Sequence, residues 1–366
     1  MKVSYYNYRR MNEFLKEDIH KELGTLLSID NDDQLYAHRH REERKIGRAL
    51  GKHFFIGTNS GTSAMQLSLT ALGIGPGDEV ITTPFTFIAT ALAISNTGAR
   101  PVFTDIDKKN LLLDIDRIEG SITERTKAIL PVHLYGQMMD MNRLSHIARR
   151  HGLHLVEDAA HAHLARFDGK LPGSLSDVAC YSFHVNKNLG GIAAGGMAIT
   201  RSWSLGRKIE ALRNPVSNTP LLLKSLRTPS FLSWIEIAFL KCKLKYIGTW
   251  TTRRREIALA YHEGLGDLPM QFQATDKRAH HVYRDFAILS DKRDNLRKHL
   301  QRKGVETALH YPQPIHLTRT YQHLRHRKGD FPASERASSR ILSLPVNPFL
   351  TDDEVGHVIK TVRLFF

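Results

Sequence analysis

Apolar and polar residues alternate in short blocks from about residue 52 onward, and these blocks predict strands and helices in turn. Short apolar runs are typical of buried strands, whereas longer segments with apolar residues every three or four positions predict helices. Helices are expected within 60–74, 86–98 and 141–152. The predicted strands are 53–58, 80–84, 100–106, 127–136, 154–160, 178–183 and 195–200. This alternation predicts an α/β domain with a largely parallel sheet, in which ligands bind beyond the carboxyl ends of the strands.

The pattern changes after about residue 201, where longer helices lead up to a helical segment at 253–265. Beyond it we expect a strand at 282–290, a polar helix at 292–304 and a strand entering a proline-rich loop at 305–316. Residues 351–366 predict a closing amphipathic helix with a threonine cap and three acidic residues in its first turn. The sequence therefore predicts a large domain over 1–245, with a helical N-terminal segment, and a smaller α+β domain over 246–366.

Composition limits the class of protein. The first residues, MKVSYYNYRRMNEF, contain no continuous apolar segment, so we expect no secretory signal. The segment Phe231–Leu240 is too short to span a bilayer and is interrupted by Glu236, which favours a buried helix. Cys180 and Cys242 have neither a disulfide pattern nor a zinc-binding spacing. We expect a cytoplasmic protein without a membrane span.

The formal net charge is +15, from lysine and arginine residues that are spread along the chain. A solvated basic surface and the attraction of an anionic small substrate are both compatible with this charge. No recognised nucleic-acid-binding motif accompanies it, so we expect no nucleic-acid partner.

Three loops with polar residues follow predicted strands. The first, TNSGTSA at 58–64, begins a helix, where free N–H groups favour a phosphate. Its residues Gly61, Thr62 and Ser63 suit either anion binding or ordinary helix capping, and both interpretations stay open. It lacks the glycine–lysine–hydroxyl ending of a Walker loop.

The second loop, HLVEDAAHAH at 154–163, places Glu157 and Asp158 at the end of an apolar strand. A carboxylate there needs a cationic partner, or else it caps a following helix. His161 and His163 lie close by, but no further ligand pattern accompanies them, so we expect no metal site.

The third loop, SFHVNKNLGGIAAGG at 182–196, surrounds Lys187 with small and polar residues between two apolar strands. Desolvation lowers the pKa of a lysine, and the neutral amine can attack a carbonyl to form a Schiff base. A phosphate-binding lysine and a surface lysine in a turn are the alternatives. Ser182, just before it, could hold a phosphate.

Together these loops suit pyridoxal phosphate. Its phosphate needs N–H and hydroxyl donors, its ring nitrogen needs a carboxylate, and its aldehyde needs a lysine. Phe87, at another strand-to-helix junction, could supply an aromatic face for the ring or belong to the core.

Several stretches resemble the DegT/DnrJ/EryC1/StrS family of sugar aminotransferases, which belong to the pyridoxal phosphate enzymes of fold type I. The resemblance covers nearly everything from Gly57 to the C-terminus. It implies a large domain with a mostly parallel seven-stranded sheet flanked by helices, and a smaller C-terminal α+β domain. The matching stretches include SGTSAMQLSLTALGIGPGDEVITTPFTFIATALAI, GARPVFTDID, TKAILPVHLYGQMMDM, VEDAAHAH, CYSFHVNKNLGG, LHYPQPIHL and ILSLPVNPFLTDDEV.

The resemblance implies a role for each matching residue. Lys187 is expected to form the Schiff base and to shuttle a proton, and Asp158 to contact the pyridinium nitrogen. His161 is expected beside the ring and Phe87 stacked on it. The expected phosphate site consists of Gly61, Thr62, Ser63 and Ser182. In the second lobe, the residues expected to contact the substrate are His310, Tyr311 and His316.

The resemblance also implies a reaction and an assembly. Family members typically transfer an amino group from glutamate to a keto sugar carried on a nucleotide, in surface-polysaccharide or natural-product sugar biosynthesis. They are usually homodimers with active sites at the subunit interface. A sugar dehydratase of the same family is disfavoured, because those enzymes replace the lysine with histidine.

The sequence departs from the family pattern in three places. The usual Gly-Pro segment before the first strand is replaced by DNDDQLYAHRHREERKIGRALG, and Ala194 stands where an acidic residue commonly precedes the paired glycines. The usual Asn-x-Arg-Met motif between the lobes is missing; Asn214 and Asn218 are the candidates to replace its asparagine. A non-catalytic or regulatory homologue is therefore an alternative function.

Overall fold

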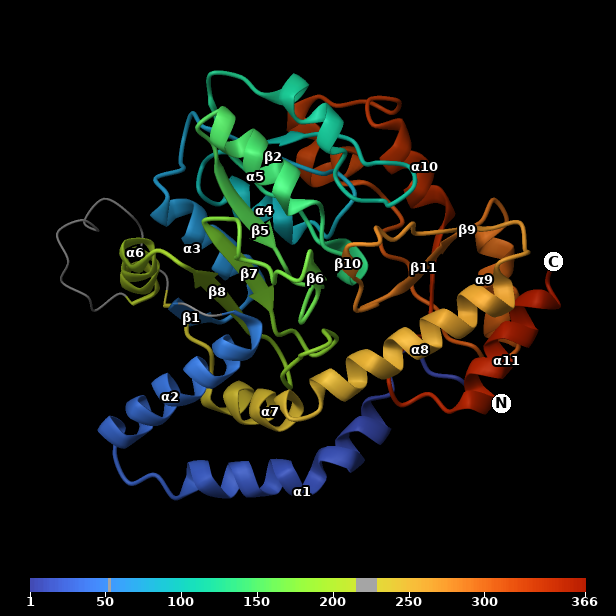
Figure 1. Ribbon diagram of the computed structural model, residues 1–366, viewed down its shortest axis with the longest axis horizontal. Coiled ribbons are helices and arrows are strands. Elements are labelled where there is room, and N and C mark those ends of the chain that lie inside the picture. The colour runs from blue at the N-terminus through green and yellow to red at the C-terminus, as the bar shows by residue number, and fades with distance from the viewer. Residues whose placement is uncertain (52–53, 215–228) are drawn as a thin grey trace.

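A seven-stranded sheet lies at the centre of the computed structural model, which describes residues 1–51, 54–214 and 229–366 (Figure 1). Its strand order is β1-β8-β7-β5-β4-β2-β3. β8 runs antiparallel to both of its neighbours, and the other neighbouring strands pair in parallel. The predicted, mostly parallel seven-stranded sheet is therefore confirmed. The strands are β1 (Phe54–Thr58), β2 (Glu79–Thr82), β3 (Arg100–Phe103), β4 (Thr126–Ile129), β5 (His154–Asp158), β7 (Val178–Ser182) and β8 (Gly196–Thr200).

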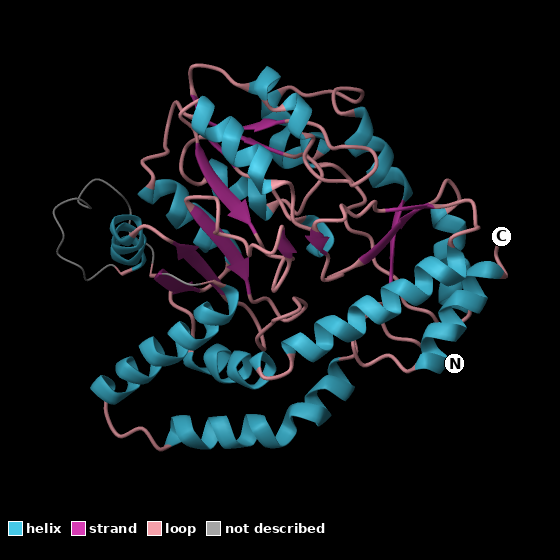
Figure 2. Cartoon of the chain, in the orientation of Figure 1, coloured by secondary structure: helices cyan, strands magenta, loops and turns pink. Residues whose placement is uncertain are grey.

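Helices cover both faces of this sheet (Figure 2). Apolar side chains of α3, α4 and α6 pack on one face with strand residues such as Val80, Val156 and Ala198. Apolar side chains of α2, α5, α7 and α10 pack on the other face. The helices are α2 (Asp32–Leu50), α3 (Gly61–Ala71), α4 (Ala89–Ser95), α5 (Met141–Arg150), α6 (Trp203–Arg213), α7 (Trp234–Leu244) and α10 (Pro332–Arg340).

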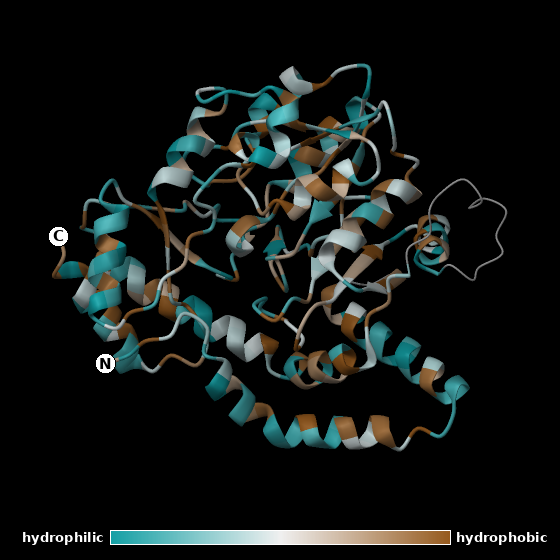
Figure 3. Cartoon of the chain, turned by 180° about the vertical axis from the view of Figure 1, so that it is seen from behind, coloured by the Kyte–Doolittle hydropathy of each residue, from teal (hydrophilic) through white to brown (hydrophobic). Residues whose placement is uncertain are grey.

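The N-terminal segment forms two long helices, α1 (Tyr8–Leu27) and α2, that turn back on each other beside α7 (Figures 1 and 3). Leu15 is the buried residue of α1, and Lys245 pairs with Asp18 at 2.6 Å to join α1 to the end of α7. The buried helix predicted around Phe231–Leu240 is confirmed, although α7 begins three residues later, after Ser233 as N-cap. Within the described ranges, no helix is both long enough and apolar enough to cross a membrane.

A second, smaller sheet of order β12-β11-β9 packs against α8, α9 and α11, around a separate apolar cluster. The closing helix and its threonine cap are confirmed, because Thr351 and Glu354 form a capping box at the start of α11. The domain boundary predicted at 245/246 falls just before α8, and the division into two domains stays a prediction. The elements are α8 (Ile247–Leu265), β9 (Gln271–Phe272), β11 (Phe286–Leu289), α9 (Arg293–Arg302), β12 (Ile341–Leu344) and α11 (Asp352–Arg363), with β6 (Arg166–Phe167) paired to β10 (Ala279–His280).

Of the strand predicted to lead into a proline-rich loop at 305–316, the strand is wrong, whereas the loop is present. This segment makes isolated bridges, from Val305 to Val3 and from Ala308 to Ser343, and β12 occupies the place beside β11. Pro312 and Pro314 lack the N–H groups that a continuing ladder requires. The segment instead runs across to the large sheet, where the N–H of Ile315 donates to the carbonyl of Pro84 at 2.8 Å.

Candidate active site

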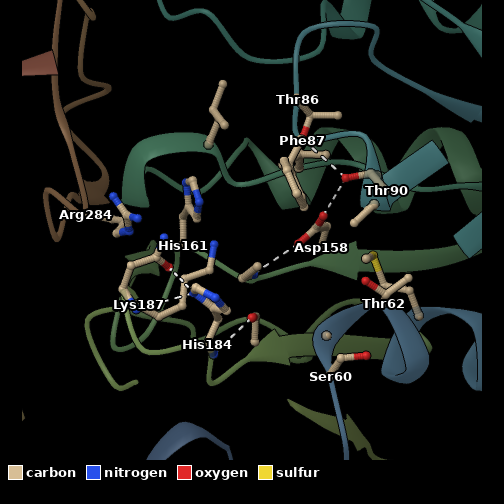
Figure 4. A pocket seen from close by; sticks show the side chains of 18 of the residues that line it. Ser60, Thr62, Thr86, Phe87, Thr90, Asp158, His161, His184, Lys187 and Arg284 are labelled. Carbon is tan, nitrogen blue, oxygen red and sulfur yellow. Dashed lines mark hydrogen bonds between the residues drawn. The ribbon is translucent and has the colours of Figure 1, made fainter. Parts of the chain in front are cut away.

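A pocket of about 300 Å³ opens where the parallel strands of the large sheet end. Its wall combines residues that follow β1, β2, β4, β5 and β7 with residues of the second lobe (Figure 4). Nine of the predicted site residues line it: Gly61, Thr62, Phe87, Asp158, His161, Ser182, Lys187, His310 and Tyr311.

The start of α3 forms one end of the pocket. Ser60 is the N-cap and accepts the Ser63 N–H at 3.1 Å. A Cβ atom on Gly61 would lie 2.9 Å from the Cβ of Ser182, and one on Gly196 would lie 2.4 Å from the carbonyl carbon of Ser60. These glycines therefore allow the ends of β7 and β8 to approach the helix start, where unpaired N–H groups attract anions.

Ser63 is not brought into the pocket. Its hydroxyl donates to Asn59 Oδ1 at 2.6 Å, while Ser60 lines the pocket in its place. The capping interpretation thus holds for Ser60, one position before the three residues singled out in the sequence.

Asp158 is the last residue of β5 and is 5% exposed. Its Oδ2 accepts a hydrogen bond from the Thr90 hydroxyl at 2.8 Å, and its Oδ1 accepts the Ala160 N–H at 3.1 Å. The interpretation of this carboxylate as a helix cap is wrong, because residues 159–164 form turns rather than a helix. The carboxylate is thereby oriented at the pocket wall.

Glu157 has a different role from its neighbour, because successive side chains of a strand point to opposite faces. Its Oε2 pairs with His133 Nε2 at 2.6 Å, and its Oε1 accepts the Gly173 N–H at 2.7 Å. The cationic or hydrogen-bonding partner that a buried carboxylate needs is therefore found on the side of the sheet away from the pocket.

Lys187 lies in the loop after β7 and lines the pocket (Figure 4). Burial and, after it, the Arg284 cation lower the pKa of its amine to about 7, against the charges of Asp158 and Asp285, which raise it. An amine of this pKa is neutral in a substantial fraction of molecules near pH 7, as a nucleophile or proton acceptor must be.

Aromatic and imidazole side chains form the pocket wall above these groups. Phe87 is 56% exposed and its ring centroid lies 5.9 Å from that of Tyr311, so Phe87 is not a core residue. Burial lowers the pKa of His161 well below its ordinary value, and the Lys187 and Arg284 cations add to this effect. The Tyr135 N–H donates to His161 Nδ1 at 3.2 Å, so the proton of the neutral ring resides on Nε2.

The second lobe contributes His310, Tyr311 and a residue that the sequence analysis missed, Arg284. The one signal for Arg284 in the sequence is a charged pair, RD, inside the otherwise apolar run VYRDFAILS. His316 is not part of the pocket; it is buried and bonds to Glu335 Oε1 through Nε2 at 3.1 Å. The other pocket residues missed by sequence analysis include Ser60, Thr86, Thr90, His184 and Asn186.

The glycine-rich loop after Lys187 is held from outside the pocket. Ala194 lines the pocket, so no carboxylate is present at this position. The buried Glu236 of α7 accepts the N–H groups of Ile192 and Ala193 at 3.0 and 2.7 Å, and Lys243 donates to the Gly191 carbonyl at 3.0 Å. The glutamate that interrupts the apolar run of α7 thus anchors this loop.

Asn214, one of the two candidates to replace the asparagine of the missing Asn-x-Arg-Met motif, does not line the pocket. Asn214 ends α6, and its N–H donates to the carbonyl of Glu210 at 3.2 Å. Asn218 lies outside the described residues. Over the described ranges, no group of three or more histidine, cysteine, aspartate or glutamate residues is arranged to hold a metal ion.

The donor set fits pyridoxal phosphate. Hydroxyl and N–H donors at the start of α3 suit a phosphate, the Asp158 carboxylate suits a protonated ring nitrogen, and the exposed Phe87 ring offers an aromatic face. The close packing at Gly61 and Gly196 leaves no space for side chains where the phosphate would be held. Lys187 places in the same pocket an amine of the kind that this cofactor requires.

Comparison with known proteins leads to the same conclusion. A model of the DegT/DnrJ/EryC1/StrS aminotransferase family matches residues 15–363. A pleiotropic regulatory protein of Geobacillus stearothermophilus is 41% identical over 315 residues, 85% of this chain and 84% of the relative. The dTDP-3-amino-3,4,6-trideoxy-alpha-D-glucose transaminase of Streptomyces venezuelae is 41% identical over 309 residues, 84% of this chain and 82% of the relative.

Among solved structures, S. venezuelae DesV in complex with a ketimine intermediate superposes with a TM-score of 0.94 at 36% identity, covering 100% of this chain and 98% of that chain. The family resemblance and the fold class expected from the sequence are confirmed, and so are the enzyme class and its cofactor. The chain belongs to the DegT/DnrJ/EryC1/StrS aminotransferase family and is a pyridoxal phosphate-dependent aminotransferase.

Proposed function

We propose that this enzyme transfers the amino group of glutamate, or of another amino acid, to a keto sugar carried on a nucleotide, in surface-polysaccharide or natural-product sugar biosynthesis. The observation that carries the proposal is that Lys187 and Asp158 line one pocket in a chain 41% identical to a dTDP-amino-sugar transaminase. The net charge of +15 is compatible with an anionic, nucleotide-linked substrate.

Four groups of this chain would hold the cofactor. The first-turn N–H groups of α3, with the hydroxyls of Ser60, Thr62 and Ser182, would bind its phosphate. Asp158, oriented by Thr90, would pair with the ring nitrogen, and Phe87 would cover a ring face. Lys187 would form the covalent link. Bound in this way, pyridoxal phosphate supplies an electron sink for the carbon next to the transferred nitrogen.

The protein's own contribution to the chemistry is proton transfer by Lys187. Its neutral amine can accept a proton from the carbon that carries the amino group and can donate one to the carbon on the other side of the transferred nitrogen. Its pKa of about 7 suits both directions, because an acid–base group is most effective when its pKa is near the operating pH. His161, held neutral by burial, presents an N–H on the same wall without adding charge.

His310 and Tyr311 are the residues that we propose to contact the substrate, whereas His161 is proposed to lie beside the cofactor ring. His316 is not proposed again, because it is buried against Glu335. We also propose a homodimer, the assembly implied by the family resemblance, and size-exclusion chromatography with light scattering tests it.

A regulatory role is the second candidate function. It is favoured by the 41% identity to a pleiotropic regulatory protein and by the missing Asn-x-Arg-Met motif. A regulator without turnover has no need for an acid–base lysine with a lowered pKa, so the pocket favours catalysis.

The test is to incubate the holoenzyme with nitrogen-15-labelled glutamate, or with other labelled amino acids in turn, and a panel of dTDP- and UDP-linked keto sugars, followed by mass spectrometry. We expect the label in an amino-sugar product. A deoxy-keto product without the label would indicate a dehydratase, and the absence of turnover with every donor and acceptor would favour the regulatory role.

A further inference from the structure

The first six residues of the chain lie against the second lobe, far from α1's contacts with α7. The Val3 N–H donates to the Gly304 carbonyl at 2.8 Å, and the Glu306 N–H donates to the Val3 carbonyl at 2.9 Å. Asn347 Nδ2 donates to the carbonyl of Ser4 at 3.0 Å. The segment is thus fixed in place by backbone hydrogen bonds to residues 304 and 306 and by a side-chain hydrogen bond from Asn347.

This attachment brings two tyrosines to a buried ion pair. Arg284 and Asp285 pair directly, with side chains that are 2% and 0% exposed. The Tyr5 hydroxyl donates to Asp285 Oδ1 at 2.5 Å, and Arg284 Nη2 donates to the Tyr6 hydroxyl at 3.0 Å. Tyr5 and Tyr6 therefore hold opposite members of the pair.

The ion pair borders the end of the pocket where Lys187 lies, the lysine end. Figure 4 shows Arg284 beside Lys187 and His161, away from Ser60 and Thr62 at the start of α3. The Arg284 charge opposes protonation of Lys187, and the Asp285 charge favours it. The titratable and charged groups that face Lys187 are Arg284, Asp285, Asp158, His161, His163 and His310.

Arg284 is poorly suited to bind a substrate anion directly. Its side chain is 2% exposed, one terminal nitrogen is used by Asp285 and the other by Tyr6. Buried ion pairs add little stability over apolar residues of similar volume, because removing both charges from water is costly. A charge effect on the neighbouring lysine explains the position of the pair better than stability or ligand binding.

We propose that Tyr5 and Tyr6 are positioning residues of the active site, which hold the Arg284–Asp285 pair so that its guanidinium faces Lys187 and controls when this lysine carries a proton. The N-terminal segment thereby acts on the reaction through the second lobe, although it contributes no residue to the pocket lining. This inference rests on the proposed function, in which Lys187 bonds to the cofactor and moves the proton.

The test is a pH titration of the visible absorbance of the cofactor bound to Lys187 in the holoenzyme. Arg284→Gln removes the opposing charge and should raise the midpoint by roughly one pH unit, whereas Asp285→Asn should lower it by a similar amount. The double variant should return close to the wild-type midpoint. A purely structural role predicts no opposite shifts.

Tyr6→Phe tests the positioning step without removing a charge. It should raise the midpoint by less than Arg284→Gln does, and it should cause no further shift in the Arg284→Gln background. Tyr36→Phe, at a tyrosine that is 51% exposed on α2, is the matched control and should leave the midpoint unchanged. Should the single-charge variants not fold, Tyr6→Phe and the double variant still decide the outcome.

The inference is overturned if folded Arg284→Gln and Asp285→Asn variants shift the midpoint in the same direction or not at all. It is also overturned if Tyr6→Phe leaves the midpoint unchanged, as the control Tyr36→Phe is expected to do. The proposed function fails separately, if the wild-type enzyme shows no cofactor absorbance or Lys187→Ala leaves that absorbance unchanged.

Discussion

The two ends of the pocket are built in different ways. At the α3 end, Asp158 and Ser182 end strands of the large sheet and Gly61 begins α3, so each lies within a short motif at the end of a strand or the start of a helix. At the lysine end, the second lobe contributes Arg284, and that arginine is held by a tyrosine 278 positions earlier in the chain. The first end is local in sequence, and the second depends on long-range packing.

This difference shows which residues are held in place by the sheet itself and which can be altered while the fold is kept. Groups at strand ends are placed by the sheet, whose geometry leaves little freedom. Groups held by side-chain contacts between distant segments can change while the fold is kept. We therefore expect substitutions at the α3 end to affect how the cofactor is bound and activated, and substitutions at the lysine end to affect proton transfer.

The largest effect is expected for Lys187 itself. Lys187→Ala removes the residue proposed as both the covalent link and the proton carrier, so we expect kcat to fall by about 10³-fold or more, with loss of the cofactor's visible absorbance. Steady-state kinetics and an absorbance spectrum check this. Lys298→Ala, at an exposed lysine of α9, is the control; retained turnover in Lys187→Ala would contradict the assigned role.

The lowered pKa of Lys187 predicts a large difference in reactivity within the apoprotein. An amine reacts only when deprotonated, so labelling of Lys187 should rise through a midpoint near pH 7, as its pKa of about 7 requires. At pH 7 its neutral fraction is roughly a thousandfold that of a lysine with ordinary pKa. Competitive amine labelling with peptide mass spectrometry measures the labelling rate of Lys187 against pH, with Lys298 as internal reference. A Lys187 midpoint above about pH 9 would show that the pocket does not desolvate the amine.

At the α3 end, Asp158→Asn should lower kcat by about 10²-fold, because it removes a preorganised charge from the ring nitrogen. Thr90→Val should cost about tenfold, since it deletes one hydrogen bond to that carboxylate and keeps the carboxylate itself. Kinetics at saturating substrate separate the two. Equal losses in both variants would show that Thr90 acts in another way than by orienting Asp158.

The smallest effect on catalysis is expected for the anchor of the glycine-rich loop. Glu236→Gln places an amide where two backbone N–H groups donate, and it should lower the free energy of unfolding by about 2 kcal/mol. Glu256→Gln, at an exposed glutamate paired with Arg253, should change it by less than about 0.5 kcal/mol. Urea denaturation of both variants checks this; equal stabilities would mean that the loop does not depend on α7.

Local patterns predicted most of the large sheet and several pocket residues. Asp158 and Lys187 could be predicted as site residues from the sequence. A carboxylate at the end of an apolar strand and a lysine between two apolar strands both lose hydration free energy on burial, which indicates that a partner or ligand compensates them. The same reasoning misplaced Ser63 by one capping position, because sequence alone does not show which hydroxyl of NSGTS turns toward the pocket. His316 was expected at the substrate on the motif LHYPQPIHL, but it turns inward to Glu335.

The sequence by itself determined the class of fold, the alternation of strands and helices and the chemistry offered at the strand ends, since these depend on local periodicity and on residue types. Tertiary structure alone decided that Thr90 orients Asp158, that Glu236 anchors the glycine-rich loop and that Tyr5 and Tyr6 hold the Arg284–Asp285 pair. These contacts join residues between 43 and 280 positions apart. Such pairings depend on how whole elements pack, and no local pattern of residues encodes them.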